Sequence, residues 1–130
     1  MDKQTGGRDK RISDRSLSAR IGRARRSGAT TLDLSRQGLT QLPEALGQLT
    51  QLKFLDLSHN QLTTVPEMLG QLTRLDWLLL NDNQLTILPE MMGQLTLLDC
   101  LDLTNNQLTT LPKALGQCTS YESCTLRTIN

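Results

Sequence analysis

Apolar residues recur along this chain with a period of 23 residues. The segment 52–62 reads Leu-Lys-Phe-Leu-Asp-Leu-Ser-His-Asn-Gln-Leu, and variants of it occupy residues 75–85 and 98–108. Each of these segments is followed by a proline and then by a Gly-Gln pair, and a recognisable first copy precedes them. A fixed period of this length predicts a solenoid, in which each repeat packs mainly against its neighbours.

The pattern inside one repeat predicts its local structure. Leu55 and Leu57 are two positions apart and are expected to point inward from a short strand, whereas Phe54, Asp56 and Ser58 alternate outward. The proline that follows each segment predicts a short helical turn on the other side of the chain. The predicted fold is therefore α/β: a right-handed solenoid with short parallel strands on a concave face and short helical turns on a convex face.

The chain before the repeats predicts a cap. Residues 1–12 are polar and basic and are expected to be a disordered arm. Residues 13–28 predict a capping helix, because Ser13 suits its start and Gly28 suits the left-handed position after its end. One apolar face on this helix would cover the open core of the first repeat. A basic helix that binds a membrane or a nucleic acid is the alternative interpretation.

Four repeats are expected between residues 29 and 120, at about 29–50, 51–73, 74–96 and 97–119. Residues 121–130 predict an incomplete or aberrant terminal repeat, since Tyr121, Cys124 and Leu126 fall in the three leucine positions of a further strand. Restoring one base after Ser120 permits a regular repeat in the shifted frame. The hypothesis is that the chain is a truncated or frameshifted product of a longer repeat protein.

An asparagine follows each of three strands, at the point where the chain must bend inward. Asn60, Asn83 and Asn106 occupy this position, and Gln37 stands there in the first repeat. A buried asparagine amide can bond backbone groups of its own bend and of the neighbouring repeat. The three residues therefore predict a ladder of side chains, with a looser first rung at Gln37.

The string Leu-x-x-Leu-x-Leu-x-x-Asn-x-Leu-x-x-Leu-Pro, found over about residues 29–119, resembles the leucine-rich repeat family. The Leu-Gly-Gln-Leu-Thr ending of the repeats is similar to the bacterial and Ras-group-related intracellular subclass, which includes the repeat regions of Roco-type GTPases. This resemblance implies a binding module. The sequence has no Gly-x-x-x-x-Gly-Lys-Ser/Thr segment, so no nucleotide activity is implied.

The charged side chains are unevenly distributed along the chain, and the cysteines indicate neither a metal site nor a disulfide framework. Residues 1–26 carry nine basic and three acidic side chains, for a net charge of +6, and the remaining residues carry five basic and ten acidic, for −5. Three cysteines, Cys100, Cys118 and Cys124, lack the spacing of metal ligands and predict free thiols in a reducing cytoplasm. We therefore expect no metal and no cofactor.

Few side chains are candidates for a catalytic or reactive role. His59 is the single histidine, and Asp82 holds the equivalent position one repeat later, so strands about 4.8 Å apart would place the two side chains close together. A general base needs a nucleophile or second carboxylate within reach, and we expect a surface His–Asp pair and no enzyme activity. Cys100 takes an outward position, either as a reactive or contact thiol or as a tolerated small residue.

Outward positions of successive strands are expected to form rows across the sheet. One row reads Thr31, Phe54, Trp77 and Cys100, and the next reads Asp33, Asp56, Leu79 and Asp102. The only Phe and the only Trp are thus neighbours, and exposed aromatics ringed by acids are typical of binding hot spots. The predicted partner-binding residues are Phe54, Asp56, His59, Trp77, Leu79, Asp82, Cys100 and Asp102.

The sequence predicts a non-catalytic protein–protein interaction module of the cytoplasm, a signalling scaffold or adaptor that holds a partner on its concave face. The partner is expected to be a protein with a basic, partly apolar epitope. An alternative is the repeat fragment of a larger, Roco-type signalling enzyme. Nucleic-acid or membrane binding is not expected, although residues 3–26 leave it open. A monomer is expected, with self-association through the uncapped C-terminal end as the alternative.

Overall fold

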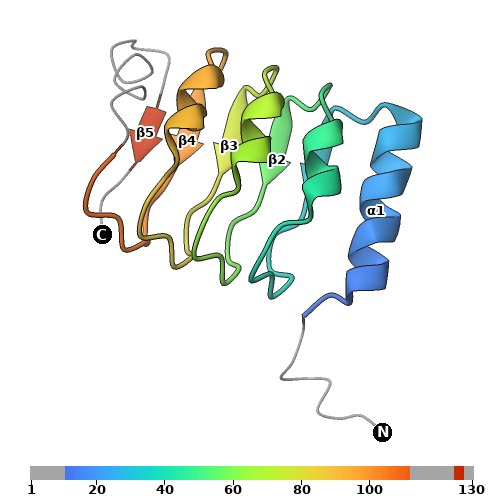
Figure 1. Cartoon of the computed structure of the whole chain (residues 1–130), viewed down its shortest axis with the longest axis horizontal. Coiled ribbons are helices and arrows are strands. Elements are labelled where there is room, and N and C mark those ends of the chain that lie inside the picture. Colours follow the sequence, from blue (N-terminus) through green and yellow to red (C-terminus); the bar gives the residue numbers. More distant parts are fainter. Residues whose placement is uncertain (1–10, 112–124, 128–130) are drawn as a thin grey trace, which may run out of the picture.

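The computed structural model describes residues 11–111 and the backbone of residues 125–127. In these residues one helix precedes a five-stranded parallel sheet whose strands lie in chain order (Figure 1). The helix is α1 (Asp14–Ser27), and the strands are β1 (Thr31–Asp33), β2 (Phe54–Asp56), β3 (Trp77–Leu79), β4 (Cys100–Asp102) and β5 (Thr125–Arg127). Short 3₁₀ helices connect the strands: η1 (Glu44–Gln48), η2 (Glu67–Gln71) and η3 (Glu90–Gln94).

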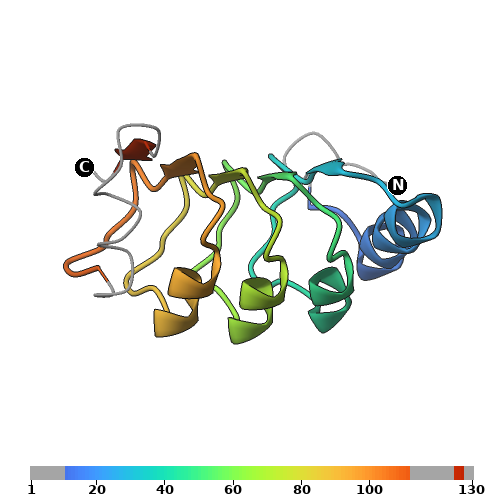
Figure 2. The ribbon, with the colours of Figure 1, turned by 90° about the horizontal axis from the view of Figure 1, so that it is seen from above.

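The strands line one side of the molecule and the 3₁₀ helices line the other, with α1 at the N-terminal end (Figure 2). From β1 to β4 each residue pairs with the residue 23 positions later, so Leu32, Leu55, Leu78 and Leu101 form one column. All four leucines are buried. This arrangement confirms the predicted α/β solenoid, because paired residues of neighbouring strands are 23 positions apart, which equals the period of the sequence.

Leucines fill the space between the two layers. Leu55 and Leu57 are fully buried, as are Leu69 and Leu72 from the opposite side of the same repeat. Each 3₁₀ helix begins after a proline whose φ lies between −69° and −73°, the range to which the ring restricts it. The proline therefore fixes where the chain turns back toward the core.

The Gly-Gln pair after each proline has a packing reason. A Cβ atom on Gly70 would lie 2.8 Å from the Met91 sulfur and 2.9 Å from Oε1 of Gln94, both in the next repeat. Gly47 has the same close approach to Gln71 and to the Met68 carbonyl. Glycine at this position lets neighbouring 3₁₀ helices approach closely, which contributes to the regular stacking of the repeats.

Helix α1 covers the N-terminal end of the core. The Ser13 hydroxyl accepts a hydrogen bond from the Ser16 N–H at 3.1 Å, and Gly28 ends the helix with a φ of 68°. The apolar side of the helix is buried in the same cluster as the repeat leucines. The residues on this side are Leu17, Ile21 and Ala24. This burial supports the interpretation of the helix as a cap, because the apolar face is already occupied.

The cap extends further toward the N-terminus than the sequence predicts. The Ile12 N–H donates to the Gln37 carbonyl at 2.8 Å, and Ile12 packs against the core. A Cβ atom on Gly38 would lie 2.9 Å from the Cα of Arg11. The expectation of disorder is therefore wrong for Arg11 and Ile12, and residues 1–10 lie outside the described residues. Later repeats have glutamine where Gly38 stands, so this glycine was the sequence feature that could have predicted the close approach of Arg11.

The strand expected near the C-terminus is present, but its register is different. Strand β5 pairs Leu126 with Leu101, which is 25 residues away rather than 23. The predicted position of Leu126 is therefore wrong by two residues, and Cys124 lies outside the described residues. The observed register aligns Leu126 with the leucine column of the earlier strands, a position that holds leucine in all four of them. Cys118 and the other residues of 112–124 lie outside the described residues, and so does the frameshift hypothesis.

The inward column generates a stability prediction. Leu78→Ala removes a fully buried side chain and should lower the free energy of unfolding by about 2–5 kcal/mol through lost burial and a residual cavity. Ile87→Ala is the matched control, because Ile87 is 59% exposed and its loss should cost less than about 0.5 kcal/mol. Denaturant unfolding followed by circular dichroism measures both. Equal stability of the two variants would contradict the inward assignment.

Candidate interaction surface

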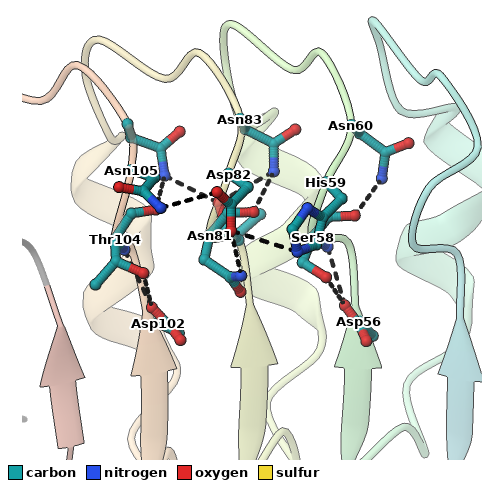
Figure 3. A network of polar contacts seen from close by, with 12 residues as sticks. Asp56, Ser58, His59, Asn60, Asn81, Asp82, Asn83, Asp102, Thr104 and Asn105 are labelled. Atoms are coloured by element: carbon teal, nitrogen blue, oxygen red, sulfur yellow. Dashed lines mark hydrogen bonds and ion pairs between the residues drawn. The ribbon is translucent and has the colours of Figure 1, made fainter. Parts of the chain in front are cut away.

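Buried asparagines hold the bends after β2, β3 and β4 (Figure 3). The Asn83 amide nitrogen donates to the carbonyls of Leu57 in the preceding repeat and Leu80 in its own, both at 3.0 Å. Its oxygen accepts from the Leu62 N–H at 3.0 Å. Asn60 and Asn106 make equivalent bonds, so the ladder expected from the sequence is present. Each rung ties two repeats together and fixes the outward side chains in register.

Gln37 does not reproduce the ladder. Its side-chain amide donates to the Ser35 carbonyl of its own repeat at 2.9 Å, and none of its described bonds reaches α1. Its backbone N–H instead donates to the Asn60 side-chain oxygen, and its carbonyl accepts from Ile12. The cap thus bonds the first bend through the backbone of Gln37 rather than through its side chain.

One residue before each ladder position, the backbone takes a left-handed conformation. Arg36, His59, Asp82 and Asn105 have φ between 57° and 61°, and we name these four residues the rim row. This conformation is uncommon for residues other than glycine, asparagine and aspartate. Sequence reasoning missed it, although the fixed place of these residues before the ladder was a usable signal. The N–H of each of the first three bonds to a carbonyl of the next repeat, which holds the conformation.

Side chains of the rim row connect three repeats (Figure 3). His59 Nε2 lies 3.4 Å from Asp82 Oδ2, which confirms the predicted pair, and the Asn105 amide donates to Asp82 Oδ1 at 2.9 Å. Hydrogen bonds from the Asn81 and Asn105 amides lower the pKa of the Asp82 carboxyl below its ordinary value. The nearby charges of His59 and Arg36 act in the same direction, and burial opposes them.

The aspartates at the strand ends are fixed from within their own repeats. Oδ1 of Asp56 accepts from the Ser58 N–H at 3.0 Å and from its hydroxyl at 2.6 Å, and Asp102 makes the same pair of bonds to Thr104. Ser58, which the alternation predicts to be outward, bonds to the outward Asp56 but is buried. Asp33 bonds to Ser35 in the same way, and these bonds lower the pKa of the Asp33 carboxyl.

The two aromatic side chains are in contact. Phe54 and Trp77 are paired across β2 and β3, with ring centroids 6.4 Å apart and planes tilted by 37°. Phe54 is half-buried, whereas Trp77 is 47% exposed. Cys100 pairs with Trp77 on the other side and is half-buried. We name the outward side chains of β1 to β4 the sheet face; Trp77 is its most exposed large apolar group.

The predicted site residues divide into two neighbouring groups. Phe54, Asp56, Trp77, Leu79, Cys100 and Asp102 lie on the sheet face, as the paired register places them. His59 and Asp82 belong to the rim row at the carboxyl ends of the strands. Within residues 11–111, no group of three or more His, Cys, Asp and Glu side chains is arranged to hold a metal ion. Among the described residues, none of the helices is long and apolar enough to cross a membrane.

Stacked 23-residue repeats, a buried asparagine ladder and an outward parallel sheet define a leucine-rich repeat solenoid. The chain belongs to the leucine-rich repeat family: models described as leucine rich repeat match residues 27–85 and 97–118. A search of curated protein sequences finds no match.

Two solved structures are similar to this chain. A leucine-rich repeat protein of Leptospira interrogans has 30% sequence identity and a TM-score of 0.67 over 90% of this chain. A leucine-rich repeat domain of a Shigella effector has 30% identity and a TM-score of 0.64 over 75%. This chain spans 33% and 41% of the lengths of those two chains. Their shared feature with this chain is the repeat region.

The polar bonds around Asp82 generate a prediction about pH. Because its pKa is lowered in the folded protein, the carboxylate contributes stability at pH above its unfolded pKa and loses that contribution as pH falls through the folded pKa. Asp82→Asn keeps a side chain that tolerates left-handed backbone and should therefore destabilise the protein at neutral pH but progressively less in acid. Denaturant unfolding at several pH values measures the difference. A difference that does not change with pH would contradict the assignment.

Proposed function

We propose that this chain is a non-catalytic module that binds a protein partner on its sheet face. The observation that carries the proposal is the exposure of Trp77 beside Phe54, on a surface where no core requirement places an aromatic pair. Large aromatic side chains of this kind are enriched among residues that dominate binding energy. The leucine-rich repeat family supports the same class of function, since its members are generally interaction modules.

The chemistry of the sheet face indicates the partner. Outward positions of β1 to β4 include three aspartates, Asp33, Asp56 and Asp102, and no lysine or arginine, while β5 places Arg127 in register with Asp102. An apolar patch of Phe54, Trp77 and the half-buried Leu79 lies among them. A protein with a basic, partly apolar epitope complements this surface, and the opposite charges would also speed association.

We propose a scaffold or adaptor role in signalling, in a reducing cytoplasm, for a monomeric chain. The cysteine number and spacing support the compartment. The Leu-Gly-Gln-Leu-Thr repeat ending supports the bacterial and Roco-related subclass. A second proposal is that the chain is the repeat fragment of a larger, Roco-type signalling enzyme, and the same repeat ending supports it. Sequencing the locus beyond Ser120 for a further repeat in the neighbouring frame tests this second proposal.

Truncation of the central aromatic residue tests the binding site. Trp77→Ala should weaken the complex with a partner, captured by affinity pull-down and then purified, by roughly 2 kcal/mol or more, because a hot-spot anchor is lost. Isothermal titration calorimetry gives the affinity, and circular dichroism shows that the fold is retained. Ile87→Ala is the control, since it removes an exposed apolar side chain away from the strands. A partner that binds Trp77→Ala as tightly as the parent chain would overturn the site.

A further inference from the structure

Leu79 interrupts a row of acids on the sheet face. Its backbone pairs with Asp56 on one side and Asp102 on the other, and the first repeat also has an aspartate, Asp33, in this row. Adjacent strands are about 4.8 Å apart, so the two flanking aspartates are separated by about two strand spacings. The result is an apolar position between two carboxylates.

Both carboxylates are held in place before any partner arrives. Asp56 and Asp102 each use Oδ1 to accept two bonds from the residue two positions later. Within residues 11–111, Oδ2 of Asp56 accepts no hydrogen bond, whereas Asp102 lies in register with Arg127 of β5. The Asp56 carboxylate therefore presents one fixed acceptor oxygen, and little side-chain entropy remains to be lost on binding.

Trp77 borders this apolar position on its own strand. It is two residues before Leu79, so both side chains emerge on the same side of the sheet. Phe54 contacts the indole from the neighbouring strand, and nearly half of Trp77 remains accessible. An exposed indole attracts a cation placed over its ring.

We infer that the sheet face recognises an arginine side chain of its partner, with the guanidinium over Trp77 and Leu79 and hydrogen-bonded to Asp56. This inference rests on the proposed function and specifies what the partner presents. Arginine fits better than lysine, because its planar guanidinium stacks on an aromatic ring and donates from two edges. Lysine carries a compact, strongly hydrated charge that cannot do both.

A peptide titration tests the inference directly. The probe is a capped peptide, Leu-Arg-Leu, added to the full chain at low salt while the indole N–H signal of Trp77, the only Trp, is followed by NMR. We expect a saturable shift of this signal with the arginine peptide at concentrations up to about 10 mM. The same peptide with citrulline, which keeps the shape and removes the charge, should shift it much less.

Two matched variants locate the acceptor. Asp56→Asn should weaken binding of the arginine peptide about tenfold, since it removes a charge-assisted hydrogen bond. Glu67→Gln removes the same charge from an exposed position in η2 and should leave the affinity unchanged. Circular dichroism checks that both variants fold. Equal binding of the arginine and citrulline peptides, equal binding of a lysine peptide, or unchanged affinity in Asp56→Asn would each overturn the inference.

Failure of this inference is distinguishable from failure of the proposed function. If the sheet face binds a protein without reading arginine, Trp77→Ala still weakens the captured complex, but Asp56→Asn and the competing arginine peptide do not. If the sheet face is not the binding surface, Trp77→Ala leaves the complex intact as well.

Discussion

The buried asparagine amides are the interaction on which the rest of the structure depends. Each strand of a solenoid ends in a bend whose backbone groups face the interior, and unpaired buried backbone groups are costly. Asn83 satisfies two carbonyls and one N–H, and these groups belong to two successive repeats. One side chain thereby closes its own bend and fixes the position of its neighbour. The uniform pairing of β1 to β4 follows, because every repeat is tied to the previous one by the same bonds.

A fixed register converts differences between repeats into a surface pattern. Inward positions hold leucine in nearly every repeat, since the core accepts little else. Outward positions are free to vary, and each substitution there falls at a known place in a row. Trp77 beside Phe54 and Leu79 between two aspartates are such differences. The candidate site is therefore built from the residues in which one repeat departs from the others, on a scaffold that the common residues hold rigid.

Sequence reasoning predicted what the period controls. The contact of Phe54 with Trp77 and the His59–Asp82 pair follow from equal spacing alone, and so does the leucine column. It failed where local bonding departs from simple alternation. Ser58 is buried because its hydroxyl turns to Asp56, and the rim row is left-handed because the bend requires it. The predicted register of β5 was wrong because the 23-residue period does not continue past the last regular repeat.

The arginines of α1 and the aspartates of the sheet face have different physical roles. The arginines of α1 lie on a helix whose apolar side is already buried, and Arg20 bonds to the Asp33 carbonyl at 2.5 Å. That bond joins the cap to the first strand, so part of the basic charge serves the fold. Asp56 and Asp102 are also bonded, and among the residues that the structure describes the hydrogen bonds of their carboxylates stay within their own repeats and use one oxygen each. Their remaining charge faces outward beside an exposed indole, which is the arrangement that a cationic side chain on a partner would complete.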